Sequence, residues 1–373
     1  MAPYLSGQVS CTPEQLLEVA AASHVGQVGG CIKRCADRWA RAFPYTGNGP
    51  HRLSKPADVA ANGVRLKLVK HTPPMMASGK FPQTAPKDNN QAAIIEQAVL
   101  LMHLQGVIEP VPPPTPGETQ HQLYHSLFLR PKKERPVPHG GSMTTAVELN
   151  CAASIRSILK AWRLIINYKL GINRYGVAQK FQGTTTRHGI QLLRTRDFMV
   201  YADVEEAYYN VPLHESCSIL CGFWILLPRL RQLAPWGWRL LTLGFGLWSA
   251  PRDFVKQLKT CLGLCRKWGI RLSDLMDDVL LAASTTDQCL QHAMVMIMTL
   301  TFFGWRVKME KLALIPSQVR EYGGKVLMTS PYITIDTPHA KWMKQLGVLR
   351  TFRSEDFSGY FGRRSLHIPL VEV

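Results

Sequence analysis

Two acidic segments of this chain have residue types that could hold a metal ion. Asp277 and Asp278 lie next to each other inside the apolar run 275–283, and Asp203 ends the apolar run 198–202. Adjacent charges are costly to bury unless a partner compensates them, and Mg²⁺, which prefers oxygen ligands, does so directly. A tight turn is an equally good interpretation of the Asp-Asp pair alone, and Asp203 alone could cap a short helix.

The net charge of the chain favours a polyanionic partner. Lys and Arg number 44 against 26 Asp and Glu, which gives a formal charge of +18. Nucleic acid is the commonest polyanion, and an anionic membrane surface is the weaker alternative. The apolar fraction of 46% is high enough for a sizeable core, so disorder of the whole chain is excluded.

Both helices and strands must position these carboxylates. Apolar and β-branched runs predict strands at 123–129, 163–168 and 198–203, and a strand-like stretch with a polar break at 270–281. Apolar residues at helical spacing predict helices at 91–105, 251–269 and 287–303. Two further short strands, 305–307 and 322–327, flank an expected loop at 311–316. The order lacks the regular alternation of a doubly wound sheet, so we expect an α+β fold.

Residues 1–89 are interpreted as an accessory region of mainly helical character that ends in a linker. Thr12 can cap a helix that begins at Pro13, and a second helix is expected at 31–43. Residues 72–87 are rich in Pro, Ser, Thr and Gly, a composition that is typical of a linker.

The cysteine pattern indicates reduced thiols and an intracellular location, in the cytoplasm or the nucleus. The nine cysteines include three pairs spaced four apart, and such pairs share one face of a helix. No second Cys/His pair with zinc-finger spacing follows any of them, and a free cysteine behaves as a small buried hydrophobe. Residues 1–11 lack the pattern of a secretory signal.

The acidic segments and their surroundings resemble, in the same order, motifs of retroelement reverse transcriptases. Residues 201–213, YADVEEAYYNVPL, look like the first catalytic motif of that family. Residues 243–254, LGFGLWSAPRDF, are similar to its LPFGL-SAP-F segment, and LMDD at 275–278 stands where the family has its Y-x-D-D box. Four further segments add to the likeness: LFLRPKK at 127–133, WRLIINY at 162–168, FGWRVKMEK at 303–311 and YGG at 322–324. The middle segments are most similar to those of DIRS-like and Ty3-like retrotransposons.

This resemblance implies an α+β right-hand polymerase fold with fingers, palm and partial thumb, in addition to the mostly helical N-terminal extension. Fingers and palm would occupy 90–330, and 331–373 would be a thumb-like segment that we expect to be truncated. The implied activity is RNA-directed DNA synthesis from a primer. Its partners would be an RNA or DNA template and deoxynucleoside triphosphates, without a membrane. Two Mg²⁺ ions, or Mn²⁺, would be held by the catalytic residues Asp203, Asp277 and Asp278.

The resemblance also assigns roles to individual residues. Nucleotide-binding positions would be Lys132, Lys133, Arg163, Tyr208, Phe245 and Gly246. Among them Tyr208 would exclude the ribose 2′-hydroxyl, and the cations would clamp the triphosphate. Primer and template support would come from Lys311, Tyr322, Gly323 and Gly324. The alternatives are a core aromatic for Tyr208, generic backbone contacts for the cations, an ordinary loop for Phe245 and Gly246, and a solvated surface side chain for Lys311.

The chain departs from the family pattern at several positions. Leu275 replaces the usual aromatic of the Asp-Asp box, Gly244 stands where proline is expected, and Lys308 stands where asparagine is usual. Residues 134–161 are longer than the family's fingers turn. These departures leave open a second function, that of a catalytically decayed or co-opted nucleic-acid binder. An RNA-templated RNA polymerase is a third, against which the bulky Tyr208 argues.

Overall fold

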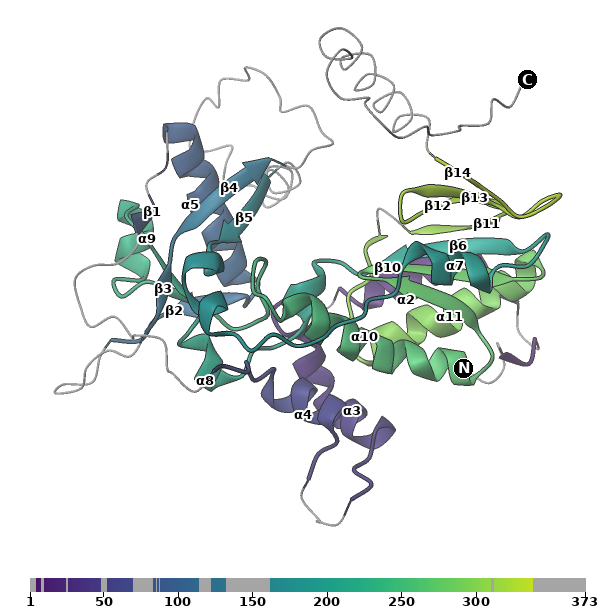
Figure 1. The fold of residues 1–373 in the computed structure, drawn as a ribbon, viewed down its shortest axis with the longest axis horizontal. Helices are drawn as coiled ribbons and strands as arrows, with labels where there is room; N and C mark the ends of the chain where they lie inside the picture. The colour runs from purple at the N-terminus through teal and green to yellow at the C-terminus, as the bar shows by residue number, and fades with distance from the viewer. Residues whose placement is uncertain are drawn as a thin grey trace, which may run out of the picture.

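The molecule has two groups of strands joined by helices (Figure 1). The structure is a computed structural model, and it describes residues 5–7, 10–24, 26–47, 52–69, 83–84, 86, 88–113, 122–131, 162–309 and 312–337. Helix α5 and strands β4 and β5 lie at one end of the molecule, and strands β6 and β10 with the β12–β14 sheet lie at the other. No helix in the described part of the chain is long and apolar enough to cross a bilayer.

A four-stranded antiparallel sheet carries both acidic segments. Its order is β11-β6-β10-β9, with β6 at Phe198–Asp203, β9 at Arg271–Leu275, β10 at Asp278–Ala283 and β11 at Ala313–Ser317. The strand-like stretch at 270–281 is therefore two strands, and its polar break is the turn between them. The expected loop at 311–316 is wrong, because β11 pairs with β6 there through a register shift.

Helices cover one face of this sheet. They are α10 at Ala250–Lys267 and α11 at Thr286–Phe302, and α2 at Pro13–Ala22 packs against α11. Alternate strand residues point to the helices, namely Val200, Ala202, Val279, Leu281 and Ala283. The intervening residues Met199, Leu280 and Ala282 enter a separate small core. Because both faces are buried, the strands read as continuous apolar runs.

A second, three-stranded sheet closes the opposite face. It consists of β12 at Val319–Tyr322, β13 at Lys325–Met328 and β14 at Thr334–Asp336, and α7 at Thr186–Leu192 packs against β9 beside it. The single strand expected at 322–327 is instead a hairpin. Its turn residues Gly323 and Gly324 both have positive φ, 56° and 73°, which a tight two-residue hairpin turn requires. The strand expected at 305–307 is reduced to one bridge, between Val204 and Val307.

The other end of the molecule contains a five-stranded sheet and a hairpin. The sheet has β1 at Gln83–Thr84, β7 at Gly222–Ile225, β8 at Trp238–Leu240 and β2 at Ile108–Pro110, with β3 at Tyr124–His125 paired to β7. The hairpin pairs β4 at Leu127–Pro131 with β5 at Trp162–Ile166, as the two predicted fingers strands imply. Helix α5 at Asn89–Leu104 is capped by the side chain of Asp88, which accepts a hydrogen bond from the Gln91 N–H. Short helices α8 at Glu215–Ser218 and α9 at Pro228–Leu233 complete this part.

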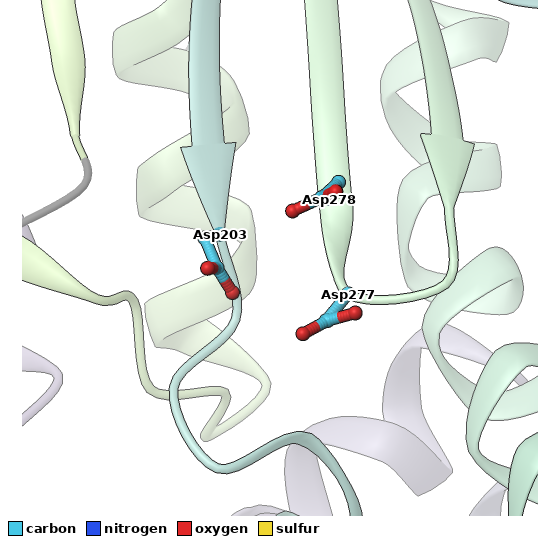
Figure 2. A group of neighbouring side chains, drawn as sticks. All are labelled: Asp203, Asp277 and Asp278. Atoms are coloured by element: carbon cyan, nitrogen blue, oxygen red, sulfur yellow. The ribbon is translucent and has the colours of Figure 1, made fainter. Parts of the chain in front are cut away.

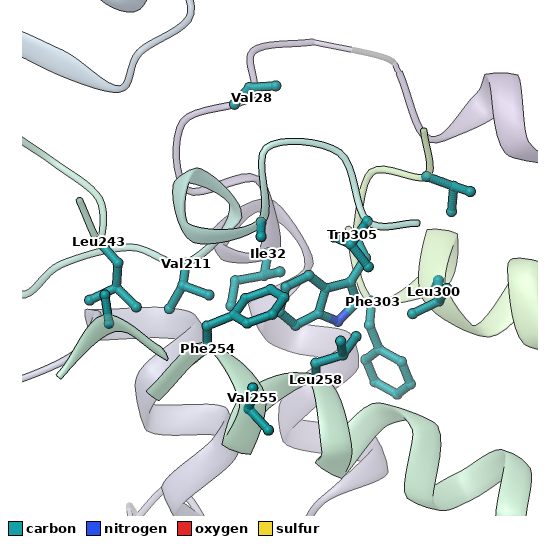
Figure 3. Packing of buried hydrophobic residues seen from close by; sticks show 14 of the residues in the cluster. Val28, Ile32, Val211, Leu243, Phe254, Val255, Leu258, Leu300, Phe303 and Trp305 are labelled. Atoms are coloured by element: carbon teal, nitrogen blue, oxygen red, sulfur yellow. The ribbon is translucent and has the colours of Figure 1, made fainter. Parts of the chain in front are cut away.

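The described parts of residues 1–89 share one core with the four-stranded sheet and its helices. They contain α2, the 3-10 turn Cys31–Cys35, α3 at Ala36–Ala42 and α4 at Lys55–Asn62. Figure 3 shows Ile32 beside Phe254 and Trp305, and Val28 belongs to the same cluster of buried residues. Trp39 is fully buried and its indole N–H donates to the Phe303 carbonyl at 3.0 Å. The N-terminal region is therefore part of the structural support of the acidic strands.

All cysteines in the described residues are unpaired with one another, and all of them except Cys35 are buried. Their burial agrees with the prediction that they are core residues, and their reduced state stays a prediction. A thiol that is removed from water behaves as a small apolar group, which explains why these cysteines lie in the core.

Candidate active site

Three carboxylates meet at the ends of β6 and β10 (Figure 2). One oxygen from each of Asp203, Asp277 and Asp278 lies within 4.8 Å of the others. Asp203 is buried, with 3% of its surface exposed, and the other two are half-buried. The expected clustering of these residues is confirmed.

The strand register explains why Asp203 and Asp278 lie together. They are directly opposed in the antiparallel β6–β10 pair, so their side chains leave the same face of the sheet. The period of two places both on the face of Met199 and Leu280, away from the helices. Asp277 belongs to the β9–β10 turn and directly follows Met276, whose φ is 59°.

Backbone hydrogen bonds hold these strand ends in place. The Val204 N–H donates to the Asp277 carbonyl at 3.0 Å, and the Lys308 N–H donates to the Asp203 carbonyl at 2.8 Å. The short helical turn after Asp203 begins only at Ala207, with Glu206 at its N-cap position. Asp203 is therefore not at the cap position of that turn.

Tyr201 is a supporting residue that the sequence analysis did not single out. Its hydroxyl donates to the Asp278 carboxylate. Burial raises the pKa of Tyr201, and so do this hydrogen bond and the nearby carboxylates, so the phenol stays a neutral donor. The available signal was the strand period, because Tyr201 lies two residues before Asp203 and hence on the same face.

Tyr208 lies against the segment around Phe245 and within reach of the charge of Asp277. Its ring centroid is 4.9 Å from that of Phe245 and 5.7 Å from that of Phe254. Burial and the charge of Asp277 raise the pKa of Tyr208, which places its hydroxyl within the field of the acidic group. The structure thus packs Tyr208 against Phe245, and the charge of Asp277 reaches the Tyr208 hydroxyl.

Gly246 allows the loop after Phe245 to approach strand β5 closely. Its φ is 96°, and a Cβ there would lie 2.9 Å from the Ile166 carbonyl oxygen. Its own carbonyl accepts a hydrogen bond from the Asn173 side chain at 2.8 Å. Gly244, where proline was expected, is also crowded, because a Cβ there would lie 2.6 Å from a methyl carbon of Leu240. Both glycines fit this packing.

The Gly323–Gly324 turn lies against the hairpin that carries Asp277. A Cβ on Gly323 would be 2.4 Å from Thr186 Oγ1 and 2.7 Å from a methyl carbon of Leu275. Tyr322, which precedes the turn, is fully buried, and its hydroxyl lies 3.4 Å from Ser273 Oγ. The predicted primer-supporting segment is therefore adjacent to the carboxylates.

The side chains of the four cations predicted to bind nucleotide or primer are outside the described set. Lys132, Lys133 and Lys311 lie outside the described residues. Arg163 is on β5, paired with Arg130 of β4, but its side chain is outside the described set. Their proposed roles stay predictions.

Buried ion pairs brace the strands that present the acidic group. Asp274, 1% exposed, binds Arg266 of α10 and accepts from Thr184 Oγ1 at 3.2 Å. Arg271 binds Asp197 through both carboxylate oxygens. Together these contacts fix β9 to α10 and to the segment before β6. Arg271 and Asp197 are 74 residues apart and Thr184 and Asp274 are 90 apart, so no local pattern in the sequence indicates these contacts, whereas Arg266 and Asp274 are only eight residues apart.

The donor set suits a hard divalent cation. Three carboxylates converge, and the group contains no thiolate or imidazole ligand. Mg²⁺ and Mn²⁺ prefer such oxygen ligands, whereas thiolate-rich sites select softer metals. The residues therefore fit the ions that the sequence resemblance implies.

The chain is similar in sequence to retroviral polyproteins. No family model matches it. It is 29% identical over 126 residues to the Gag-Pro-Pol polyprotein of Human T-cell leukemia virus 2, a match over 32% of this chain and 8% of that protein. It is 24% identical over 330 residues to the Gag-Pol polyprotein of Avian reticuloendotheliosis virus, over 80% of this chain and 28% of that protein. The chain thus spans less than a third of these curated relatives.

Two solved structures with a similar fold are those of foamy viral protease-reverse transcriptases. The foamy viral protease-reverse transcriptase in complex with an RNA/DNA hybrid matches with a TM-score of 0.51 and 14% identity, over 92% of this chain and 40% of that one. The foamy viral protease-reverse transcriptase dRH in complex with double-stranded DNA matches with a TM-score of 0.51 and 12% identity, over 84% and 48%. These likenesses confirm the predicted α+β polymerase fold.

Proposed function

We propose that this chain is the polymerase part of a retrotransposon reverse transcriptase of the DIRS-like or Ty3-like type. It would join deoxynucleotides to the 3′-hydroxyl of a primer on an RNA or DNA template. One observation carries the proposal: Asp203, Asp277 and Asp278 converge on one face of an antiparallel strand pair, in a sheet of the reverse transcriptase fold.

The charge of the chain and its structural neighbours support nucleic acid as the partner. The formal charge is +18, which suits a phosphate backbone. The foamy viral enzymes were solved with an RNA/DNA hybrid and with double-stranded DNA. By analogy, this chain would bind a primer–template duplex. The free, buried cysteines are consistent with an intracellular site of action, which we also propose.

In the proposed reaction, Asp203, Asp277 and Asp278 would hold two Mg²⁺ or Mn²⁺ ions. Such ions, when bound, lower the pKa of the primer hydroxyl and neutralise charge on the leaving pyrophosphate. Tyr201 orients Asp278 through its hydrogen bond, and the strand register fixes Asp203 beside it. Phe245 and Gly246 would lie beneath the nucleotide, with Tyr208 bounding the sugar. Lys132, Lys133 and Arg163 would clamp the triphosphate, while Lys311, Tyr322, Gly323 and Gly324 would support the primer and template.

A primer-extension assay tests the proposal. We expect extension of a DNA primer on an RNA template with deoxynucleotides and Mg²⁺, and loss of extension to background in Asp277→Asn. The matched control is Asp287→Asn, an exposed aspartate in the first turn of α11, which should keep full activity. Far-UV circular dichroism of both variants establishes that they fold. A folded Asp277→Asn that extends primers as well as the parent would overturn the proposal.

The departures from the family motifs favour a second candidate, a decayed nucleic-acid binder. Leu275 and Lys308 stand in the segments that flank the acidic group. This candidate predicts that the protein binds a primer–template hybrid but extends it with neither Mg²⁺ nor Mn²⁺. The same assay, run with a binding measurement, separates the two functions.

A further inference from the structure

A cavity of about 420 Å³ lies between helix α4 and the first turns of helix α10. We refer to it as the α4–α10 cavity. Lys55 and Lys67 come from α4 and the segment after it, Arg252 and Lys256 come from α10, and Trp248 and Gln179 form part of the wall. None of the three clustered aspartates lines it, and neither Tyr208 nor Phe245 does, so it is distinct from the acidic site.

The lining of this cavity carries an excess of positive charge. Five cations and two carboxylates contribute: Lys55, Arg65, Lys67, Arg252 and Lys256 against Asp58 and Asp253. Each carboxylate is already paired, Asp58 with Arg65 at 3.0 Å and Asp253 with Arg252 at 2.5 Å. The three lysines form no ion pair with another described residue. Three positive charges therefore surround the cavity without a negative partner.

The lysines are close enough to affect one another. The pKa of Lys256 is lowered by partial loss of water and by the positive charges of Arg252, Lys55 and Lys67, while the charge of Asp253 opposes this shift. Like charges that crowd one position repel each other, and a bound anion relieves that repulsion. The lysines are exposed at the rim, whereas the Arg252 side chain is only 15% exposed and forms the deeper part.

Three buried polar atoms of the lining lack hydrogen-bond partners among the described residues. They are Nε of Arg252, Oε1 of Gln179 and Oγ of Ser249. A buried donor without an acceptor costs about 1–3 kcal/mol, and native structures keep few of them. An anion would accept from the Arg252 Nε–H, and the Gln179 amide can turn its NH₂ toward the same ligand.

The walls of the cavity are held by fixed contacts. The Gln257 side chain of α10 donates to the Pro56 carbonyl of α4 at 2.8 Å. The Trp248 indole lies against Gly176, where a Cβ would be 2.4 Å from the ring, and its N–H donates to the Val177 carbonyl at 3.4 Å. The site is therefore formed before any ligand arrives, which reduces the entropic cost of binding.

We propose that the α4–α10 cavity binds a phosphate group, as an anion site separate from the acidic group. The positive end of the α10 helix dipole adds to the charge of the lysines, since Arg252 and Asp253 belong to its first turn. The phosphate belongs either to the backbone of a single-stranded nucleic acid or to a free polyphosphate. Both present the same chemistry to the lysines, and the experiment distinguishes them.

The test is isothermal titration calorimetry of the full chain with two probes, inorganic tripolyphosphate and a 12-residue oligodeoxythymidylate. EDTA is present, so that no divalent cation links a probe to the aspartates. We expect Lys55→Ala/Lys67→Ala to weaken binding of tripolyphosphate at least tenfold. The control Lys33→Ala/Lys267→Ala removes the same charge from exposed positions outside the cavity and should change the dissociation constant less than twofold.

The outcomes separate the sources and the failures. If the cavity variant weakens both probes and tripolyphosphate competes with the oligonucleotide, the ligand is the nucleic-acid backbone. If only tripolyphosphate is weakened, the ligand is a free polyphosphate. Lys55→Arg/Lys67→Arg should restore binding, which a folding defect would not allow. Equal binding by the cavity and control variants overturns the inference. Because no catalysis is measured, this result is independent of polymerase activity.

Discussion

Tyr208→Ala is expected to relax the discrimination between deoxyribonucleotides and ribonucleotides. The Tyr208 ring packs against Phe245, with ring centroids 4.9 Å apart, and the charge of Asp277 contributes to the raised pKa of its hydroxyl. Under the proposed function, this ring occupies the space that the 2′-hydroxyl of an incoming ribonucleotide would need. Removing it opens that space and leaves the three aspartates in place.

The expected magnitude follows from the packing of the ring. Loss of a fully buried aromatic costs about 3–5 kcal/mol, so a half-buried ring such as that of Tyr208 costs about 2 kcal/mol. That is less than the roughly 5–15 kcal/mol of a typical fold, so the variant should remain folded. Selection by a clash should exceed the roughly 10- to 200-fold effect of one methylene. We therefore expect the preference for the deoxynucleotide to fall by at least about tenfold.

The assay compares kcat/KM for dCTP and CTP on one primer–template, in the parent and in three variants. Tyr208→Phe keeps the ring and should keep the selectivity. Tyr209→Ala removes a neighbouring ring that contacts the same Phe245 at 5.5 Å, but the pKa of Tyr209 is raised by burial and Glu206 rather than by Asp277. It should lose stability without losing selectivity. An unchanged ratio in an active Tyr208→Ala would make Tyr208 a core aromatic and favour an RNA polymerase.

Three further predictions concern stability and binding. Trp39→Ala should lower the free energy of unfolding, measured in urea titrations, by about 3–5 kcal/mol. The buried Trp39 indole packs on Phe303 with ring centroids 4.7 Å apart, and a loss below about 1 kcal/mol would contradict the shared core. Burial raises the pKa of Cys31 and Cys289 to about 12 and that of Cys265 to about 11. In the unfolded chain these thiols ionise near pH 9. The stability that their raised pKa values provide is therefore complete below pH 9 and is lost as the pH rises toward 11–12. At pH 10, ionisation of the thiol in the unfolded chain should lower the free energy of unfolding by about 1.4 kcal/mol for each of these cysteines. We expect a lower urea midpoint at pH 10 than at pH 8, and Cys289→Ala should partly suppress this decrease. Binding of a primer–template hybrid should weaken by orders of magnitude from about 50 to 200 mM salt in a fluorescence-anisotropy titration, and a flat salt response would exclude a phosphate-dominated interface.

The local sequence determines which segments become strands and where their acidic residues stand. The apolar run before Asp203 predicts a buried strand, and the polar break at Asp277 predicts a turn or a strand end. Both are local properties, since residue type and spacing set the backbone preference within a few residues. The period of two also places Tyr201 on the same face as Asp203, although the sequence analysis did not use it.

Only the tertiary structure decides which of these segments meet. Asp203 faces Asp278 because β6 pairs with β10, and nothing in either segment specifies that register. Trp39 is a core residue only because Phe303 lies against it. Lys67 and Lys256 share one cavity only after α4 packs on α10. Such contacts join residues far apart in the chain, and their free energy comes from burial and charge in the folded molecule, which no short window of sequence contains.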